Sequence, residues 1–195
     1  MRPADVAAAV LEAIPDALGV ASLGTAVSAL RLASGDGVHL YLGGSMGSAL
    51  PVALGLADAL PQRSIVALVG DGELLMGASA LWSVAAFRPP NVSIVVLADG
   101  RYSITGGQPL SGEARFGDVA AALGGVASAC PSDTKGIVTA LLQLPGPRLV
   151  EALVDEPEWP GPSPFVDPGR VRVRLEQLLL EPDADRQPSL TAGDP

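Results

Sequence analysis

Short apolar runs alternate along the chain with longer stretches in which apolar residues recur at helical spacing. Two of the short runs, SIVALVG at 64–70 and VSIVVLA at 92–98, are apolar almost throughout. Such runs are typical of parallel strands that are covered on both faces, and the longer stretches are typical of the covering helices. The pattern predicts an α/β fold: a three-layer, doubly wound, mostly parallel sheet with helices on both faces.

The same pattern gives an expected order of elements. Strands are expected at 18–22, 38–43, 64–70, 92–98, 126–130 and 148–155, and helices at 4–14, 25–34, 45–60, 73–87, 118–125, 133–144 and 170–180. The segment 99–117 is rich in glycine and polar residues and is predicted to be a loop. It is long for a compact domain, and long ordered loops are usually functional.

The length fits a single domain. A chain of 195 residues can bury a substantial core but is too short for two ordinary domains. We expect the domain to occupy residues 1–181, with a proline-rich link at 156–169 before the last helix. The polar tail at 182–195 is expected to be disordered.

Composition and charge narrow the function classes. The formal net charge is -9, and Lys135 is the only lysine, which argues against nucleic acid as a partner. No apolar run approaches the roughly 20 residues of a membrane span, and no secretory signal is recognisable, so we expect no membrane partner and a cytoplasmic location. The single Cys130 excludes an internal disulfide and is predicted to be a buried structural thiol. His39 is expected at a strand edge without a catalytic role.

Two aspartates follow two of the predicted strands directly. Asp71 comes after the strand at 64–70 and Asp99 after the strand at 92–98, each followed by a glycine. Parallel strands joined by a helical crossover end at one edge of the sheet, so the two carboxylates should lie together where α/β sheets bind ligands. Paired carboxylates suit Mg²⁺, and a helix opening at Glu73 would direct N–H groups at an anion. A magnesium-bridged diphosphate fits this arrangement.

Spacing alone leaves alternatives open. An Asp-Gly pair is also an ordinary turn after a strand, and a receiver-type regulatory domain gathers carboxylates at the same edge. A second glycine-rich turn, LGGSMGSALP, carries Gly43, Gly44 and Gly47 around Met46. Its glycines would let backbone carbonyls face a ligand, with Met46 either an apolar support for that ligand or a core residue. No dinucleotide glycine fingerprint and no phosphate-binding lysine loop is present.

Three segments in order, GSMGSALPVALGLADALP, GDGELLM and LADGRYSITGGQP, carry a family resemblance. They resemble the diphosphate-binding domain of thiamine diphosphate-dependent 2-oxoacid decarboxylases. The likeness is greatest to the beta subunit of sulfopyruvate decarboxylase and to the C-terminal part of phosphonopyruvate decarboxylase, and it runs from roughly residue 5 to 180. The resemblance implies the thiamine diphosphate-binding fold, with thiamine diphosphate and Mg²⁺ as cofactors.

The resemblance also implies roles for individual residues. Asp71, Asp99 and the main-chain carbonyl of Arg101 would be the metal ligands, with Asp99 standing where the family usually has Asn. The carbonyl of Gly44 would accept a hydrogen bond from the cofactor's 4′-amino group, and Met46 would wedge the cofactor into its bent shape. Main-chain N–H groups would hold the diphosphate, and the segment at Gln108 would cover the site. The implied cofactor-binding residues are Gly24, Thr25, Gly44, Ser45, Met46, Gly70, Asp71, Gly72, Glu73, Asp99, Arg101, Tyr102 and Gln108.

The glutamate that activates the cofactor in this family belongs to a separate pyrimidine-binding domain, which is not found in this sequence. The resemblance therefore implies a partner, a pyrimidine-binding alpha subunit, in an α₂β₂ or larger assembly that acts on a small anionic 2-oxoacid. No catalytic residue is assigned to this chain. Two alternatives stay open: a carboligase subunit that resembles acetolactate synthase, and a non-catalytic Mg²⁺-binding receiver-like or scaffold domain.

Overall fold

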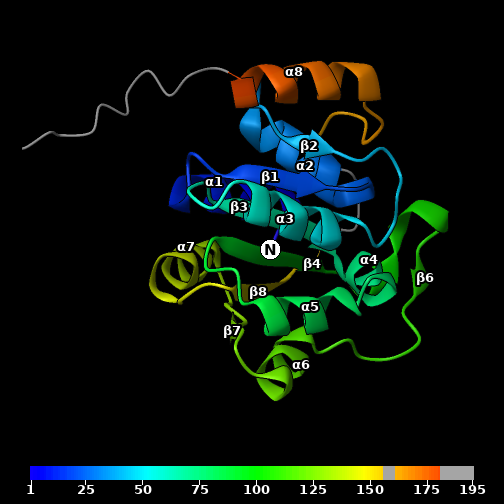
Figure 1. Ribbon diagram of the computed structural model, residues 1–195. Helices are drawn as coiled ribbons and strands as arrows, with labels where there is room; N and C mark the ends of the chain where they lie inside the picture. The colour runs from blue at the N-terminus through cyan, green and yellow to red at the C-terminus, as the bar shows by residue number, and fades with distance from the viewer. Residues whose placement is uncertain (156–160, 181–195) are drawn as a thin grey trace, which may run out of the picture.

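A six-stranded parallel sheet forms the centre of the molecule (Figure 1). The computed structural model describes residues 1–155 and 161–180, so the predicted tail at 182–195 lies outside the described residues. The strand order is β2-β1-β3-β4-β8-β7. The strands are β1 (Leu18–Ala21), β2 (Leu40–Tyr41), β3 (Ile65–Gly70), β4 (Val92–Ala98), β7 (Ala127–Ala129) and β8 (Arg148–Leu153). The predicted α/β fold with a parallel sheet is confirmed.

Helices cover both faces of this sheet. One face packs against α1 (Pro3–Ala13), α2 (Gly24–Ser34) and α7 (Thr134–Gln143). The other face packs against α3 (Ala49–Ala59), α4 (Asp71–Met76), α5 (Ala80–Phe87) and α6 (Phe116–Leu123). The last helix, α8 (Pro168–Leu180), lies beside the edge strand β2 (Figure 1).

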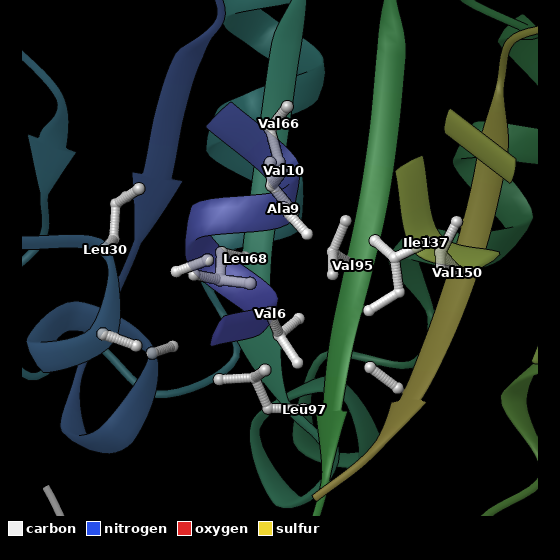
Figure 2. Packing of buried hydrophobic residues seen from close by; sticks show 14 of the residues in the cluster. Val6, Ala9, Val10, Leu30, Val66, Leu68, Val95, Leu97, Ile137 and Val150 are labelled. Atoms are coloured by element: carbon white, nitrogen blue, oxygen red, sulfur yellow. The ribbon is translucent and has the colours of Figure 1, made fainter. Parts of the chain in front are cut away.

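The two central strands bury both of their faces, which is why their sequences read as continuous apolar runs. On β3, Leu68 points to the α1 side and Ala67 to the α3 side, and both side chains are fully buried. Figure 2 shows Val10 and Val6 of α1 above and below Leu68 in the view, with Val95 of the neighbouring strand β4 to the side. Each aliphatic side chain buried in this way contributes about 1.5–3 kcal/mol.

Two of the predicted helices have different limits in the structure. The helix expected at 73–87 is two helices, α4 and α5, because the chain breaks at Gly77. A Cβ on Gly77 would lie 2.3 Å from the carbonyl oxygen of Gly47, so two backbone segments meet here with no room for a side chain. The helix expected at 45–60 begins only at Ala49, because the glycine-rich segment before it turns with positive φ at Gly43, Gly44 and Gly47.

The predicted loop at 99–117 contains structure of its own. A short antiparallel pair, β5 (Arg101–Tyr102) and β6 (Gln108–Pro109), encloses the 3-10 turn η1 (Ser103–Thr105). Because β5 follows directly on β4, this pair stands at the carboxyl edge of the sheet.

The link between β8 and α8 is fastened to α2. The buried Ser28 hydroxyl donates to the carbonyl of Pro162 at 2.7 Å and accepts from the N–H of Gly161 at 3.2 Å. The part of the link at 156–160 lies outside the described residues.

Two single residues can be compared with their predictions. Cys130 was predicted to be buried, and this is wrong: it follows the short strand β7 and is exposed. His39 lies next to β2 as expected, buried, with Nδ1 accepting from the N–H of Gly19 at 3.0 Å. Burial lowers the pKa of this imidazole to about 4.

Within residues 1–155 and 161–180, no helix combines the length and the apolar character that a membrane crossing demands.

Replacing Gly77 by Ala tests the backbone contact between the two glycine turns. The added methyl group must displace the Gly47 carbonyl, so we expect a loss of about 1–3 kcal/mol in the free energy of unfolding. Gly55→Ala is the matched control: Gly55 lies inside α3 with nothing within 4 Å of a Cβ, and Ala there should stabilise the protein by about 0.5–1 kcal/mol. Urea unfolding of both variants measures the difference, and equal stabilities would contradict the contact.

Candidate functional site

A cavity of about 250 Å³ opens at the carboxyl edge of the sheet. It is lined by the ends of β3 and β4, the start of α2, the turn before α3, and the segment from β5 to η1. All of the predicted site residues line it except Ser45 and Gln108. The structure thus brings together residues that span positions 24 to 102 of the sequence.

A larger cleft of about 790 Å³ lies elsewhere, between α3 and α5. Its lining is mostly apolar, and Asp58 is the one charged residue among its described lining. The smaller cavity combines carboxylates, main-chain turns and apolar walls, which is the usual make-up of a cofactor site. The chemistry therefore points to the smaller cavity.

Asp71 joins the ends of two neighbouring strands. Its Oδ1 accepts from the N–H of Gly72, and its Oδ2 accepts from the N–H of Gly100, both at 2.7 Å. The β3–β4 register pairs Gly70 with Leu97, which sets the Gly100 turn beside Asp71. Asp71 is only 3% exposed, and burial raises the pKa of its carboxyl group, with a further contribution from the negative charge of Asp99. A cation at this point would relieve both effects.

Asp99 is held by the segment that follows it. Its Oδ1 accepts from the N–H of Arg101 at 2.8 Å, and its Oδ2 accepts from the hydroxyl of Ser103 at 2.8 Å. Both carboxylates are therefore fixed at the cavity, and Asp99 is half-buried. Among the described residues, no group of three His, Cys, Asp or Glu side chains could hold a metal ion. A metal here would need oxygens from the main chain or from a ligand in addition to this pair.

Two glycines are required by the close approach of the loop. A Cβ on Gly72 would lie 2.7 Å from the ring of Tyr102, so the ring packs directly on the backbone that follows Asp71. Gly24 begins α2 with a φ of +61°, and a Cβ there would lie 3.1 Å from Ile104 of η1. A side chain at position 72 would displace the Tyr102 ring, and one at position 24 would be strained by the positive φ and would press on Ile104.

The glycine-rich turn before α3 forms another wall. The N–H of Gly44 donates to the carbonyl of Ser22 at 3.0 Å, and the N–H of Met46 donates to the carbonyl of Gly44 at 2.9 Å. Gly44 has a φ of +119°, which favours glycine. Met46 is half-buried and lines the cavity, so it is not a core residue.

Glu73 is the second carboxylate of α4 and is buried, at 5% exposure. Its Oε1 accepts from the N–H of Ala49 at 3.4 Å, while its Oε2 and the hydroxyl of Ser22 are buried without a hydrogen-bond partner among the described residues. Burial raises the pKa of the Glu73 carboxyl to about 7, against smaller opposing effects of the Ser22 hydroxyl and the Ala49 N–H. From the sequence, only the main-chain N–H of Glu73 has a predicted role, and the buried position of its side chain is a finding of the structure.

Two predicted residues do not line the cavity. Gln108 is exposed and closes its own turn, with Oε1 accepting from the Thr105 hydroxyl and Nε2 donating to the Thr105 carbonyl, both at 2.8 Å. Ser45 is exposed at the tip of the glycine-rich turn. Whether either residue meets a ligand stays a prediction.

Several lining residues were not foreseen, and they are mostly apolar or belong to the η1 turn: Leu23, Ala26, Leu97, Ser103, Ile104, Thr105 and Val154. The position of Ser103–Thr105 in a long polar loop directly after Asp99 was the signal that could have indicated them.

The fold and the cavity together define a cofactor-binding α/β domain whose site lies at the carboxyl edge of a parallel sheet. Comparison with known proteins gives the family. Residues 19–152 match the family described as "Thiamine pyrophosphate enzyme, C-terminal TPP binding domain", and the chain belongs to it. The cofactor of this domain is thiamine diphosphate, which is another name for thiamine pyrophosphate.

Individual relatives agree with this assignment. The chain is 34% identical over 200 residues to a phosphonopyruvate decarboxylase from Streptomyces viridochromogenes, covering 98% of this chain and 50% of the relative. It is 44% identical over 70 residues to the sulfopyruvate decarboxylase subunit beta from Methanothermobacter thermautotrophicus, covering 36% of this chain and 37% of the relative.

A solved structure gives the same picture. The thiamine diphosphate-dependent 4-hydroxybenzoylformate decarboxylase from Rhodococcus jostii superposes with a TM-score of 0.67 at 27% identity, covering 80% of this chain and 33% of that one. The matched regions thus cover half or less of the length of each of these proteins.

The buried Glu73 carboxyl predicts a pH dependence of stability. Its pKa is 4.5 in the unfolded chain and about 7 in the folded one, so unfolding releases a proton between these values and the stability that Glu73 contributes falls as the pH rises from 4.5 to 7. At about 1.4 kcal/mol for each pKa unit, the loss can reach about 3 kcal/mol. Urea unfolding of the wild type and of Glu73→Gln across this range measures the effect. The buried His39 contributes a slope of opposite sign in both proteins, so the stability of the wild type relative to Glu73→Gln should fall across this range. Two parallel curves would refute the assignment.

Proposed function

We propose that this chain holds the diphosphate end of thiamine diphosphate, with Mg²⁺, as one subunit of a 2-oxoacid decarboxylase. The observation that carries the proposal is the joint position of Asp71 and Asp99 in one cavity with the glycine-rich turn of Gly44. The family match supplies the cofactor, and the residues present fit it. A pair of carboxylates with no third acidic or imidazole ligand in the described part of the chain suits a metal that also binds diphosphate oxygens.

In this proposal the metal ligands are the carboxylates of Asp71 and Asp99 and the main-chain carbonyl of Arg101. The N–H groups of Gly72 and Glu73 serve the diphosphate. The Gly72 N–H donates to Asp71 Oδ1 in the structure, so this donor lies directly beside the carboxylate that would bind the metal. Gly24 and Thr25, at the start of α2, line the same end of the cavity.

The turn before α3 serves the other end of the cofactor. The carbonyl of Gly44 already accepts from Met46, and its second lone pair remains for the cofactor's amino group. Met46 supplies an apolar surface under the bent cofactor. The bound cofactor supplies an electron sink for loss of CO₂ from a 2-oxoacid, while the protein supplies orientation and charge placement.

A second chain is part of the proposal. The cavity, at about 250 Å³, is smaller than the roughly 300–1,000 Å³ of complete small-molecule sites. One relative is named as a sulfopyruvate decarboxylase subunit beta. These facts support a pyrimidine-binding alpha subunit that completes the site and brings the activating glutamate, in an α₂β₂ or larger assembly.

The substrate class rests on the relatives' names and on one local charge. Phosphonopyruvate and sulfopyruvate are 2-oxoacids with a second anionic group. Arg101 is exposed at the rim of the cavity, with Nη1 donating to the carbonyl of Gly107 at 3.2 Å. Its guanidinium is suited to attract such an anion in a chain whose net charge is -9.

Substitution of the aspartates tests the metal site. Asp71→Asn should lower the affinity for thiamine diphosphate and Mg²⁺ by about 100-fold or more, since even outer contacts of a metal site are worth about 10–100-fold. Asp99→Asn keeps an oxygen ligand and removes a charge beside the diphosphate, so affinity should not fall. Asp16→Asn, an exposed residue remote from the cavity, is the control. Titration calorimetry measures all three, and an unaffected Asp71→Asn variant would rule out this metal site.

Reconstitution tests the need for a partner. The chain alone should release no CO₂ from phosphonopyruvate or sulfopyruvate in the presence of cofactor and Mg²⁺, and addition of the pyrimidine-binding subunit should restore turnover. Full activity of the isolated chain would contradict the two-subunit arrangement. Analysis of the products with an added acceptor aldehyde separates decarboxylation from carboligation.

A further inference from the structure

The buried Glu73 side chain reaches from α4 to the start of α3. Ala49, the first residue of α3, is completely buried, and its N–H is one of the helix-terminal donors that have no acceptor inside the helix. The preceding Ser48 does not cap the helix, because its hydroxyl donates to the carbonyl of Ser45. Glu73 Oε1, from α4, is the acceptor for the Ala49 N–H, at 3.4 Å.

The Glu73 side chain also lies beside Ser22, the residue that binds the other end of the glycine-rich turn. The turn at 43–48 is hydrogen-bonded to the residue that follows β1: the carbonyl of Ser22 accepts from the N–H of Gly44 at 3.0 Å. The Ser22 hydroxyl is buried beside the Glu73 carboxyl group, and both Ser22 Oγ and Glu73 Oε2 have no hydrogen-bond partner among the described residues. Glu73 therefore lies beside both hydrogen bonds that flank the turn, the one from the Gly44 N–H to Ser22 and the one from the Ala49 N–H to Glu73 itself.

We propose that Glu73 is a positioning residue that sets the distance between the turn at 43–48 and the start of α4, and so between the two ends of the cofactor site. This inference rests on the proposed function, in which Gly44 and Met46 meet the pyrimidine half of the cofactor while Asp71 and Gly72 hold the diphosphate half. Glu73 joins the halves directly, since it belongs to the diphosphate element and binds the element that follows the turn.

Two probes separate this role from a general structural one. Thiamine diphosphate with Mg²⁺ needs both halves of the site, whereas inorganic pyrophosphate with Mg²⁺ needs only the diphosphate half. Glu73→Ala should weaken binding of thiamine diphosphate about tenfold, the scale of one lost hydrogen bond, and should weaken pyrophosphate binding less, because the main-chain N–H at position 73 is kept. Glu73→Gln keeps a side-chain oxygen for the Ala49 N–H and should restore binding of thiamine diphosphate. Glu12→Ala, an exposed position on α1, is the control.

The inference is overturned if Glu73→Ala binds thiamine diphosphate like the wild type, if it loses both probes equally, or if Glu73→Gln fails to restore binding. A wild-type chain that binds neither probe, alone or with its partner subunit, would instead refute the proposed function.

A measurement without any ligand tests the positioning role of Glu73 whether or not the proposed function is correct. Hydrogen exchange of the Ala49 amide should be about tenfold faster in Glu73→Ala than in the wild type, and close to wild type in Glu73→Gln. Unchanged exchange in Glu73→Ala would show that Glu73 does not hold the start of α3.

Discussion

The carboxylate of Asp71 is the point at which the two central strands of the sheet are joined beyond their last backbone pair. One oxygen accepts from the N–H of Gly72 at the start of α4 and the other from the N–H of Gly100 in the turn after β4, each at 2.7 Å. Burying a carboxylate is costly, and two N–H donors offset only part of that cost while the charge of Asp99 adds to it. The Asp71 carboxylate is thus held in place by two hydrogen bonds, while its negative charge is only partly compensated. This combination favours a divalent cation.

The remaining walls of the cavity are placed relative to this point by close contacts at glycines and by the Glu73 side chain. The glycine-rich turn meets the end of α4 through the Gly47–Gly77 backbone contact, and it meets the start of α4 through Glu73. The β5–η1 segment is set by its packing on Gly24 and Gly72. The positions of Met46 and Tyr102 therefore depend on backbone approach as much as on their own side chains.

The sequence predicted the parts of this arrangement that follow from strand periodicity. Buried strands at 64–70 and 92–98 require a helical crossover, and this alone brings Asp71 and Asp99 together. The ends of the helices were harder to predict from the sequence, because the break at Gly77 depends on a contact with Gly47, thirty residues earlier. The exposure of Cys130 could not be foreseen either, since a short apolar strand does not reveal that it is the outermost one in the sheet. The reach of Glu73 toward Ala49 needs the relative placement of two helices, which no local pattern encodes.

The ring of Tyr102 on Gly72 has an evolutionary consequence. A side chain at position 72 would need the space that the ring fills, so a change at position 72 requires a change in the size or the position of the residue at 102. Homologous domains with a larger residue at 72 should therefore tend to carry a smaller one at 102, even though neither residue donates to a metal through its side chain.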